Sequence, residues 1–193
     1  GGPLSGMQGS QATDGSGDDT AADKELQLLR QVTSRAVKIA LLKNIEQLAN
    51  LFERKATQNF LLPHVISFMN DDDFEVRSAF CKYIPSIGNL LGAVSTEGIV
   101  IPCLVAAIPD SEELVVLSAI QGMASIIQNR ILSTRSPILW NILRQVVPLL
   151  VHPNGDIRDE AKKLVCSMCE VLSREQILVQ VLPQLGTVCA YDI

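Results

Sequence analysis

The stretch that decides the fold is Asn70-Asp71-Asp72-Asp73-Phe74-Glu75-Val76-Arg77-Ser78-Ala79-Phe80, an acidic turn followed by the start of an amphipathic helix. The apolar stripe of this helix is Val76, Phe80, Ile84 and Ile87, spaced as one face of a helix requires. The same stripe returns once before this helix and twice after it, at nearly constant spacing, as Val37, Leu41, Ile45, Leu48; Val115, Ala119, Met123, Ile126; and Ile157, Ala161, Val165, Met168. Four tiers with a period of about 40 residues predict a repeat protein.

The composition favours stacked helices over sheets. Hydrophobic residues make up 47% of the 193 residues, but aromatic residues make up only 4%. A core rich in Leu, Ile, Val and Ala and poor in aromatic residues is more typical of helical layers than of a β-sandwich. A single hairpin cannot bury the apolar faces of both its helices, whereas stacked neighbours can. We therefore expect an all-α fold, an α-solenoid (α-α superhelix) of about four helical hairpins.

The expected domain organisation has two parts. Residues 1–23 contain four Asp residues, no Lys or Arg and few apolar side chains, which predicts a disordered acidic, Gly/Ser-rich linker or tag. Residues 24–193 are expected to form the repeat domain. Its hairpins are predicted at about 24–54, 56–92, 95–130 and 136–173, with a partial repeat at 174–187.

The first helices of the hairpins align in the same frame. Their apolar column is Leu61, Val100, Ile142 and Val181. Proline takes one slot in three of these helices, as Pro63, Pro102 and Pro183, and Arg144 takes that slot in the remaining one. Pro85 lies inside a second helix, where we expect it to kink the helix rather than end it, because the apolar stripe continues beyond it.

The charge pattern gives no reason to expect nucleic-acid binding. The net charge is −5, and residues 1–23 carry −4 of it, so the repeat domain has 16 basic and 17 acidic residues and a net charge of −1. A nucleic-acid groove would need clustered basic residues and stacking aromatic side chains. No apolar run reaches the roughly 18 residues of a membrane span. We expect a cytoplasmic chain that does not insert into a membrane.

Each candidate catalytic or metal-binding residue has a simpler structural explanation. Cys166 and Cys169 form a C-x-x-C in the middle of an expected helix, where packing as small apolar side chains accounts for them better than redox or zinc chemistry. His152 lies in a His-Pro-Asn turn and is interpreted as a turn or capping residue, and no activated nucleophile lies near His64. We expect no catalytic residue, cofactor or metal site, and therefore no enzymatic activity in this chain.

One polar pattern recurs on the second helices and is the candidate partner-binding surface. Its rows hold Lys43, Lys82, Gln121 and Lys163; Gln47, Ser86, Ser125 and Ser167; and Asn50, Asn89, Gln128 and Glu170. Positions four and three residues apart lie on one side of a helix, so stacking would join these twelve residues into one surface, here called the polar face. The alternative is that the polar face is merely solvated.

The repeat unit resembles a HEAT repeat. Such a unit has about 39 residues, with proline in the first helix, Asp in the turn and Val-Arg at the start of the second helix. Asp71 with Val76-Arg77 matches this pattern, and Ile157-Arg158 matches it in the fourth hairpin. The third hairpin has Val116 where Arg is usual, so a ladder of Asp–Arg pairs between repeats is expected to be interrupted there.

The resemblance extends from the generic repeat to one family. Seven motifs occur in order: Leu61-Leu62-Pro63-His64, Phe68-x-Asn70-Asp71, Arg77-x-Ala79-Phe80, Asp110-x-Glu112-Glu113-x-Val115, His152-Pro153-Asn154, Ile157-Arg158 and Leu182-Pro183. In this order and spacing, over about residues 56–186, they resemble the helical-repeat region of the phosphoinositide 3-kinase regulatory subunit 4 family. That family provides the large regulatory subunit of the class III lipid kinase.

The resemblance implies a function for this chain. It implies a non-catalytic protein–protein interaction scaffold in the class III phosphatidylinositol 3-kinase complex, which acts in autophagy and endosomal sorting. The implied partners are the catalytic subunit and the other proteins of that complex, and the implied location of the full-length complex is peripheral, on endosomal and autophagic membranes. The family's kinase-like domain lies outside this segment. The alternative is a HEAT scaffold of a protein phosphatase or another assembly.

Overall fold

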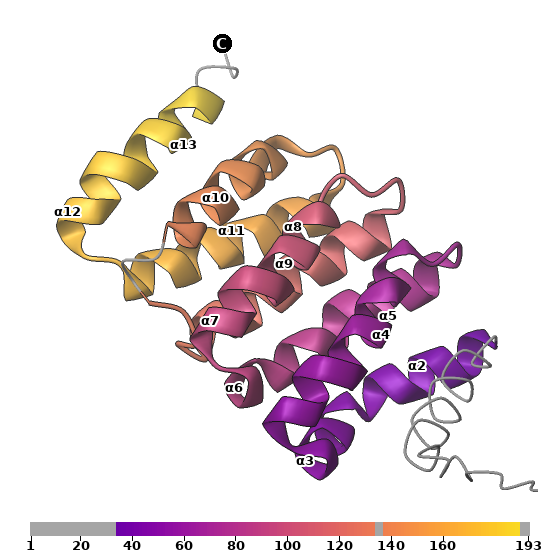
Figure 1. Ribbon diagram of the computed structural model, residues 1–193. Coiled ribbons are helices and arrows are strands. Elements are labelled where there is room, and N and C mark those ends of the chain that lie inside the picture. Colours follow the sequence, from indigo (N-terminus) through magenta and orange to yellow (C-terminus); the bar gives the residue numbers. More distant parts are fainter. Residues whose placement is uncertain (1–33, 134–136, 190–193) are drawn as a thin grey trace, which may run out of the picture. The chain divides into compact units, whose positions relative to one another are not determined.

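The computed structural model describes residues 34–133 and 137–189 (Figure 1). The expectations for residues 1–23, and for the first helix of the first hairpin, lie outside the described residues. Within the described ranges all regular structure is helical, and no strand occurs. The expected all-α class is confirmed.

The second helices of the hairpins form one layer of the molecule. The layer contains α2 (Arg35–Lys43), α3 (Ile45–Ala56), α5 (Phe74–Tyr83), η3 (Ile84–Ile87), α6 (Gly88–Leu91), α9 (Glu113–Gln128) and α11 (Gly155–Val171). Within it α2 packs against α5, α5 against α9, and α9 against α11. Successive hairpins therefore stack in chain order (Figure 1).

The first helices form the other layer. It contains η1 (Thr57–Leu61), α4 (Leu62–Ile66), η2 (Ser67–Asn70), α7 (Ala93–Ser95), η4 (Thr96–Val100), α8 (Ile101–Ala106), α10 (Ile138–Val146), η5 (Val147–Val151), α12 (Arg174–Gln176), η6 (Ile177–Val181) and α13 (Leu182–Cys189). α8 packs against α9 and α10, and α13 packs against η5. Two layers of stacked helices, each hairpin touching its neighbours, make an α-solenoid.

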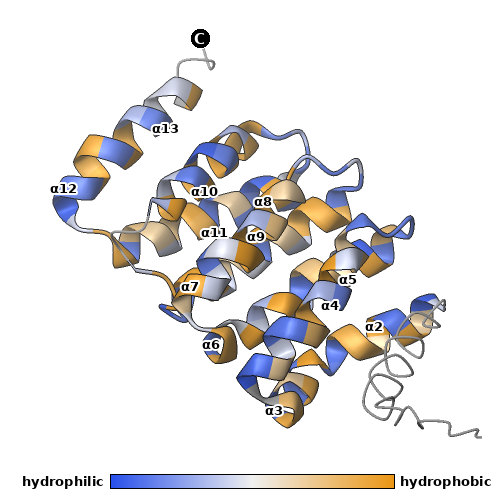
Figure 2. Ribbon diagram, viewed as in Figure 1, coloured by the Kyte–Doolittle hydropathy of each residue, from blue (hydrophilic) through white to orange (hydrophobic). Residues whose placement is uncertain are grey.

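The core lies between the layers and follows the repeat frame. Val76, Phe80, Ile84 and Ile87 are at most 1% exposed, and the stripes of α9 and α11 are buried as well. The longer helices in Figure 2, such as α9 and α11, carry both hydrophobic and hydrophilic residues, as amphipathic helices must. Val37, in the outermost described tier, is 50% exposed. The apolar columns therefore place the helices correctly, and burial is incomplete only at the end of the stack.

Proline changes the hydrogen bonding of the first helices. π-helical turns occur at Thr57–Leu61, Thr96–Val100 and Ile177–Val181, each ending two residues before a proline of the shared slot. Proline has no N–H and its ring repels the carbonyl four residues back. The helix widens instead, so that the N–H of Leu62 donates to the carbonyl of Thr57, five residues earlier. α10, with Arg144 in the slot, remains a regular α-helix from Ile138 to Val146.

Proline in other positions produces 3-10 turns. Pro85 lies in η3 between α5 and α6, and the buried stripe continues through Ile87 and Leu91. This matches the expected kink. The second helix of the first hairpin is interrupted at Asn44, whose side chain donates to the carbonyl of Ala40 over 2.7 Å. A side-chain bond of this kind competes with the helical ladder.

Two buried threonines fix the turns between hairpins. The Thr57 hydroxyl donates to the carbonyl of Ala49 over 3.0 Å, and the Thr96 hydroxyl donates to the carbonyl of Gly88 over 3.2 Å. Residues eight apart in a straight helix would lie about 12 Å apart, so the chain must turn back between them. In the second case Gly92, with φ 79°, makes the turn. In the first case the turn falls within the helical span of α3.

Candidate protein-interaction surface

The polar face is assembled from four successive second helices. Lys43 ends α2, Gln47 and Asn50 lie on α3, and the corresponding residues of the second hairpin fall on α5, η3 and α6. The break at Asn44 and the 3-10 turn at Pro85 do not disturb the register, since α3 packs against both η3 and α6. The remaining six residues lie on α9 and α11.

Most of the polar face is open to solvent. Ten of its twelve residues are exposed, and Ser125 is half-buried. Ser167 is only 7% exposed, because it lies between α9 and α11 and accepts a hydrogen bond from Nε2 of Gln128 over 3.1 Å. Its assignment to an accessible surface is therefore corrected, and it contributes to packing between hairpins.

The polar face differs along its length in how its side chains are paired. Lys163 forms an ion pair with Glu160 over 2.6 Å, and the Ser86 hydroxyl donates to the carbonyl of Tyr83 over 2.8 Å. Nζ of Lys82 lies 5.6 Å from the centre of the Tyr83 ring. Within the described ranges no side-chain hydrogen bond or ion pair is formed by seven of the twelve residues: Lys43, Gln47, Asn50, Lys82, Asn89, Gln121 and Glu170.

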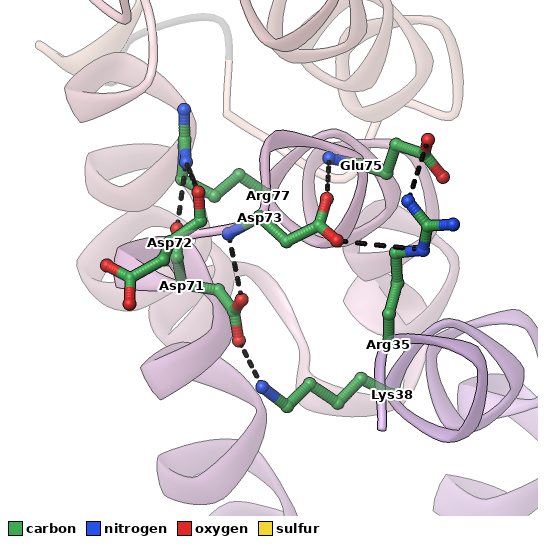
Figure 3. Close-up of polar contacts among 7 residues, drawn as sticks. All are labelled: Arg35, Lys38, Asp71, Asp72, Asp73, Glu75 and Arg77. Carbon is green, nitrogen blue, oxygen red and sulfur yellow. Dashed lines mark hydrogen bonds and ion pairs between the residues drawn. The ribbon is translucent and has the colours of Figure 1, made fainter. Parts of the chain in front are cut away.

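Two ion pairs, here called the ladder, join the first three hairpins at the edge where the acidic turns lie. Lys38 on α2 pairs with the Asp71 carboxylate over 2.6 Å (Figure 3). One repeat later Arg77 forms two parallel bonds to Asp110, Nε to Oδ2 over 2.8 Å and Nη2 to Oδ1 over 2.9 Å. The Nη1 of Arg77 donates to the carbonyls of Asp71 and Asp72. Bidentate pairing of this kind fixes orientation as well as adding energy.

The acidic turn beside the ladder also caps a helix, and the ladder itself shifts the pKa of its carboxyls. Asp73 is the N-cap of α5 and accepts from the N–H of Glu75. Arg77 donates to Asp110 and lowers the pKa of that carboxyl below its usual value. Burial alone would raise the pKa of Asp71, but hydrogen bonds from Lys38 and from the backbone of Asp73 outweigh it and lower the pKa.

The predicted interruption of the ladder is found between the third and fourth hairpins. Val116 is 4% exposed and packs in the core, and no ion pair joins α9 to α11 in the part of the chain that the structure describes. Instead Nδ2 of Asn154 donates to Glu113 over 2.6 Å. Nη1 of Arg158 donates to the carbonyls of His152 and Pro153, as Arg77 does in its own turn.

The free cysteines of the described ranges differ in how deeply they are buried. Burial raises the pKa of Cys81 to about 12, so the thiol is protonated at neutral pH. It lines a cavity of about 340 Å³ whose wall also contains Asp71, Arg77 and Asp110, all engaged in the ladder. Cys169 is half-buried, but Cys166 is exposed and the expectation that it packs in the core is wrong. Cys166 takes the repeat position that Pro85 and Ala124 take in the preceding hairpins. It is exposed because, among the described residues, no further second helix covers this side of α11.

The histidines have structural positions. The ring of His152 accepts the N–H of Asn154 at Nδ1 over 3.1 Å, which confirms its interpretation as a turn residue. The ring of His64 packs edge-on against Phe68 with centroids 5.2 Å apart, and burial lowers its pKa. Across residues 34–133 and 137–189 no group of three or more His, Cys, Asp or Glu residues could hold a metal ion. No helix in those ranges is both long and apolar enough to cross a bilayer.

Comparison with known proteins places this arrangement among its relatives. Residues 12–193 match the family model described as PIK3R4-like, middle domain. The probable serine/threonine-protein kinase vps15 of Dictyostelium discoideum is 32% identical over 168 residues, which are 87% of this chain and 8% of that protein. The chain thus spans less than a tenth of the length of this relative.

Two further similarities are more limited. The serine/threonine-protein phosphatase 4 regulatory subunit 4 of Mus musculus is 31% identical over 101 residues, which are 52% of this chain and 11% of that protein. The fold is also similar to that in the crystal structure of Cex1p, with a TM-score of 0.72 and 18% sequence identity. The aligned region covers 90% of this chain and 33% of the Cex1p chain. At this identity the structural likeness supports the fold alone.

Proposed function

Because the chain belongs to the PIK3R4-like family, as its middle domain, we propose that it is a non-catalytic scaffold segment in the regulatory subunit of a class III phosphatidylinositol 3-kinase complex. Its role is to hold the catalytic subunit and the other proteins of the complex at fixed relative positions. The parent protein would act peripherally on endosomal and autophagic membranes, and this segment would contribute protein contacts rather than membrane insertion.

The observation that carries the proposal is the continuous stack of four second helices with an exposed polar face. Stacked hairpins with a shared core resist bending, because each hairpin is packed on its neighbours over the length of its helices. The ladder of Lys38–Asp71 and Arg77–Asp110 fixes the register of the first hairpins. A repeat array of this kind provides an extended surface and a spacer, which are the two properties a scaffold needs.

The test uses the full-length parent protein. Deleting the segment that corresponds to residues 34–189 is expected to lower the amount of lipid kinase catalytic subunit that co-purifies with it, because the spacer is lost. Replacing the segment by an unrelated helical-repeat segment of similar length is the control for a simple length requirement. Unchanged recovery of the catalytic subunit with the deletion would contradict the proposal.

A second candidate function is scaffolding of a protein phosphatase. The observation favouring it is the similarity to the phosphatase 4 regulatory subunit over about half of the chain. Under this alternative the full-length protein would co-purify with a phosphatase catalytic subunit and not with a lipid kinase. The same purification therefore separates the two candidates.

A further inference from the structure

We propose that the polar face binds an extended acidic peptide segment of a partner protein, laid across the second helices. The inference rests on the proposed scaffold function, since it specifies the kind of partner segment that the scaffold holds. It is carried by three features of the described residues: the repeat of the rows, the unpaired amides and the unpaired lysines.

The spacing of the rows suits an extended chain. Packed helices lie about 8–10 Å apart, and a peptide in the extended polyproline II conformation advances about 3.1 Å per residue with three residues per turn. Each row of the polar face repeats once per hairpin, so a peptide crossing the helices would present every third residue to the same row. The register is continuous from α3 to η3 and α6, and from α5 to α9.

The amide row can bind the peptide backbone. Asn50 and Asn89 occupy the same slot one hairpin apart, both are exposed, and neither side chain has a partner in the described part of the protein. A side-chain amide offers a donor and an acceptor, which match the C=O and N–H of an extended peptide. Gln128 directs its Nε2 to Ser167 and keeps its carbonyl oxygen as an acceptor.

The lysine row gives the peptide its charge. On α11 the lysines are neutralised locally, since Lys162 pairs with Asp159 and Lys163 with Glu160. Neither Lys43 nor Lys82 forms an ion pair with a carboxylate among the described residues. A merely solvated face would be expected to show the local pairing of α11 throughout. The two free lysines therefore favour acidic side chains three residues apart at the α2–α5 end.

The opposite end of the polar face determines which half of the bound peptide should be acidic. Glu170 occupies the last position of the amide row on α11, where Asn50 and Asn89 stand in the first two hairpins. A carboxylate at that end disfavours an acidic peptide by like-charge repulsion. The bound segment should thus carry its acidic residues over α2 and α5 and neutral polar residues over α9 and α11.

The experiment measures peptide binding by fluorescence anisotropy with the 193-residue chain. The probe is a labelled peptide, long enough to cross four helices, with Asp at every third position in its first half and Ser and Gly elsewhere. The same peptide with Asn in place of Asp is the neutral control. We expect Lys43→Ala/Lys82→Ala to weaken binding of the acidic peptide by at least about tenfold, and Asn50→Ala/Asn89→Ala to weaken binding of both peptides.

The matched control removes two positive charges elsewhere. Arg144→Ala/Arg174→Ala alters exposed residues of the first-helix layer, on α10 and α12, and should leave peptide affinity unchanged. If this control weakened peptide binding equally, the proposal would be overturned, because the loss of net positive charge alone would explain the effect. Equal affinity for the acidic and neutral peptides would overturn it as well.

A parallel measurement of binding to lipid vesicles distinguishes a peptide ligand from an anionic membrane. Binding to phosphatidylserine/phosphatidylcholine vesicles that is lost in Lys43→Ala/Lys82→Ala, without binding to the acidic peptide, would assign the polar face to an anionic membrane and overturn the proposal. Absence of peptide binding, together with retained co-purification of the lipid kinase by the parent protein, would refute this inference and leave the scaffold function standing. Peptide binding without such co-purification would support the inference and refute the lipid kinase assignment.

Discussion

Arg77 and Arg158 occupy the same slot in two hairpins and share half of their contacts. Each uses Nη1 to bind two carbonyls of its own turn. Arg77 also clamps the carboxylate of Asp110 in the next hairpin, whereas Arg158 has no carboxylate partner within the described ranges. The two residues therefore separate the contribution of the turn from that of the contact between hairpins.

Replacing these arginines should affect stability unequally. Arg77→Ala removes two charge-assisted bonds and leaves Asp110 unpaired at 14% side-chain exposure, so we expect a loss of about 2–3 kcal/mol in the free energy of unfolding. Arg158→Ala removes only bonds to backbone carbonyls, and about 1 kcal/mol is expected. Urea denaturation of both variants provides the measurement. Equal losses would show that the bond to Asp110 contributes little.

The ladder should make stability depend on pH in the acidic range. Pairing with Arg77 holds the pKa of Asp110 below its ordinary value of 3.8, so the unfolded chain binds the proton first as the pH falls. The stabilisation is complete above that ordinary value and is lost as the pH falls through the lower folded-state pKa. The difference in unfolding free energy between the natural chain and Asp110→Asn should thus be constant above about pH 5 and shrink below about pH 4. A difference that grows on acidification would contradict this assignment.

At the scale of the element, proline determines how each first helix is bonded. The three π-helical turns precede Pro63, Pro102 and Pro183, and the helix with Arg144 has none. The sequence revealed the shared slot but not its consequence, because proline can be accommodated in a helix by a kink or by a π-helical turn. Thr57 and Thr96, which lie one repeat apart in the sequence, are the signal that could have indicated the turns between hairpins.

Close approach of α5 and α9 depends on one glycine. A Cβ at Gly122 would lie 2.6 Å from the carbonyl oxygen of Cys81, which is backbone and cannot move aside. Gly122→Ala should therefore destabilise the fold by about 1–3 kcal/mol despite the better helix propensity of alanine. Gly186, on α13, has no atom within 4 Å of such a Cβ, and Gly186→Ala should stabilise by about 0.5–1 kcal/mol. Thermal melts of the pair measure both effects, and a stabilised Gly122→Ala would mean that α5 and α9 are not in close contact.

Much of the fold could be predicted from period and burial, and less of the candidate surface. The apolar columns placed the second helices correctly because burial between stacked neighbours requires them. Its position in the middle of a helix predicted packing for Cys166, and this failed because the side of α11 that carries it has no described neighbour. For the polar face, register predicted which residues align, but it could not show that Ser167 is buried or that Lys163 is already paired.

At the scale of the whole molecule, the array is a row in which each hairpin contacts its neighbours. α9 packs against α5 on one side and α11 on the other, whereas α13 packs on η5 at the end of the described array. Stability in such an array is a sum over contacts between neighbours. Helices with two neighbours should therefore open less often than helices with one.

Hydrogen exchange should reveal this gradient. Backbone amides of α9, between Glu113 and Gln128, are expected to exchange more slowly than those of α2 and α13, which lie at the two ends of the described stack. Mass spectrometry of peptic fragments under native conditions measures it. Uniform protection along the chain would indicate that the array unfolds only as a whole.

The missing arginine at Val116 also makes the response to solvent conditions uneven along the array. Ion pairs supplement the apolar contacts of α2 with α5 and its turn, and of α5 with the following turn, while α9 and α11 are joined by apolar contacts and by hydrogen bonds of side-chain amides. Salt weakens ion pairs, although the pairs of the ladder are mostly buried and are therefore screened less than surface pairs, and it does not screen apolar contacts. High ionic strength would therefore make the first half of the repeat array more flexible than the second half. The position at which the array bends would then depend on salt concentration as well as on the sequence.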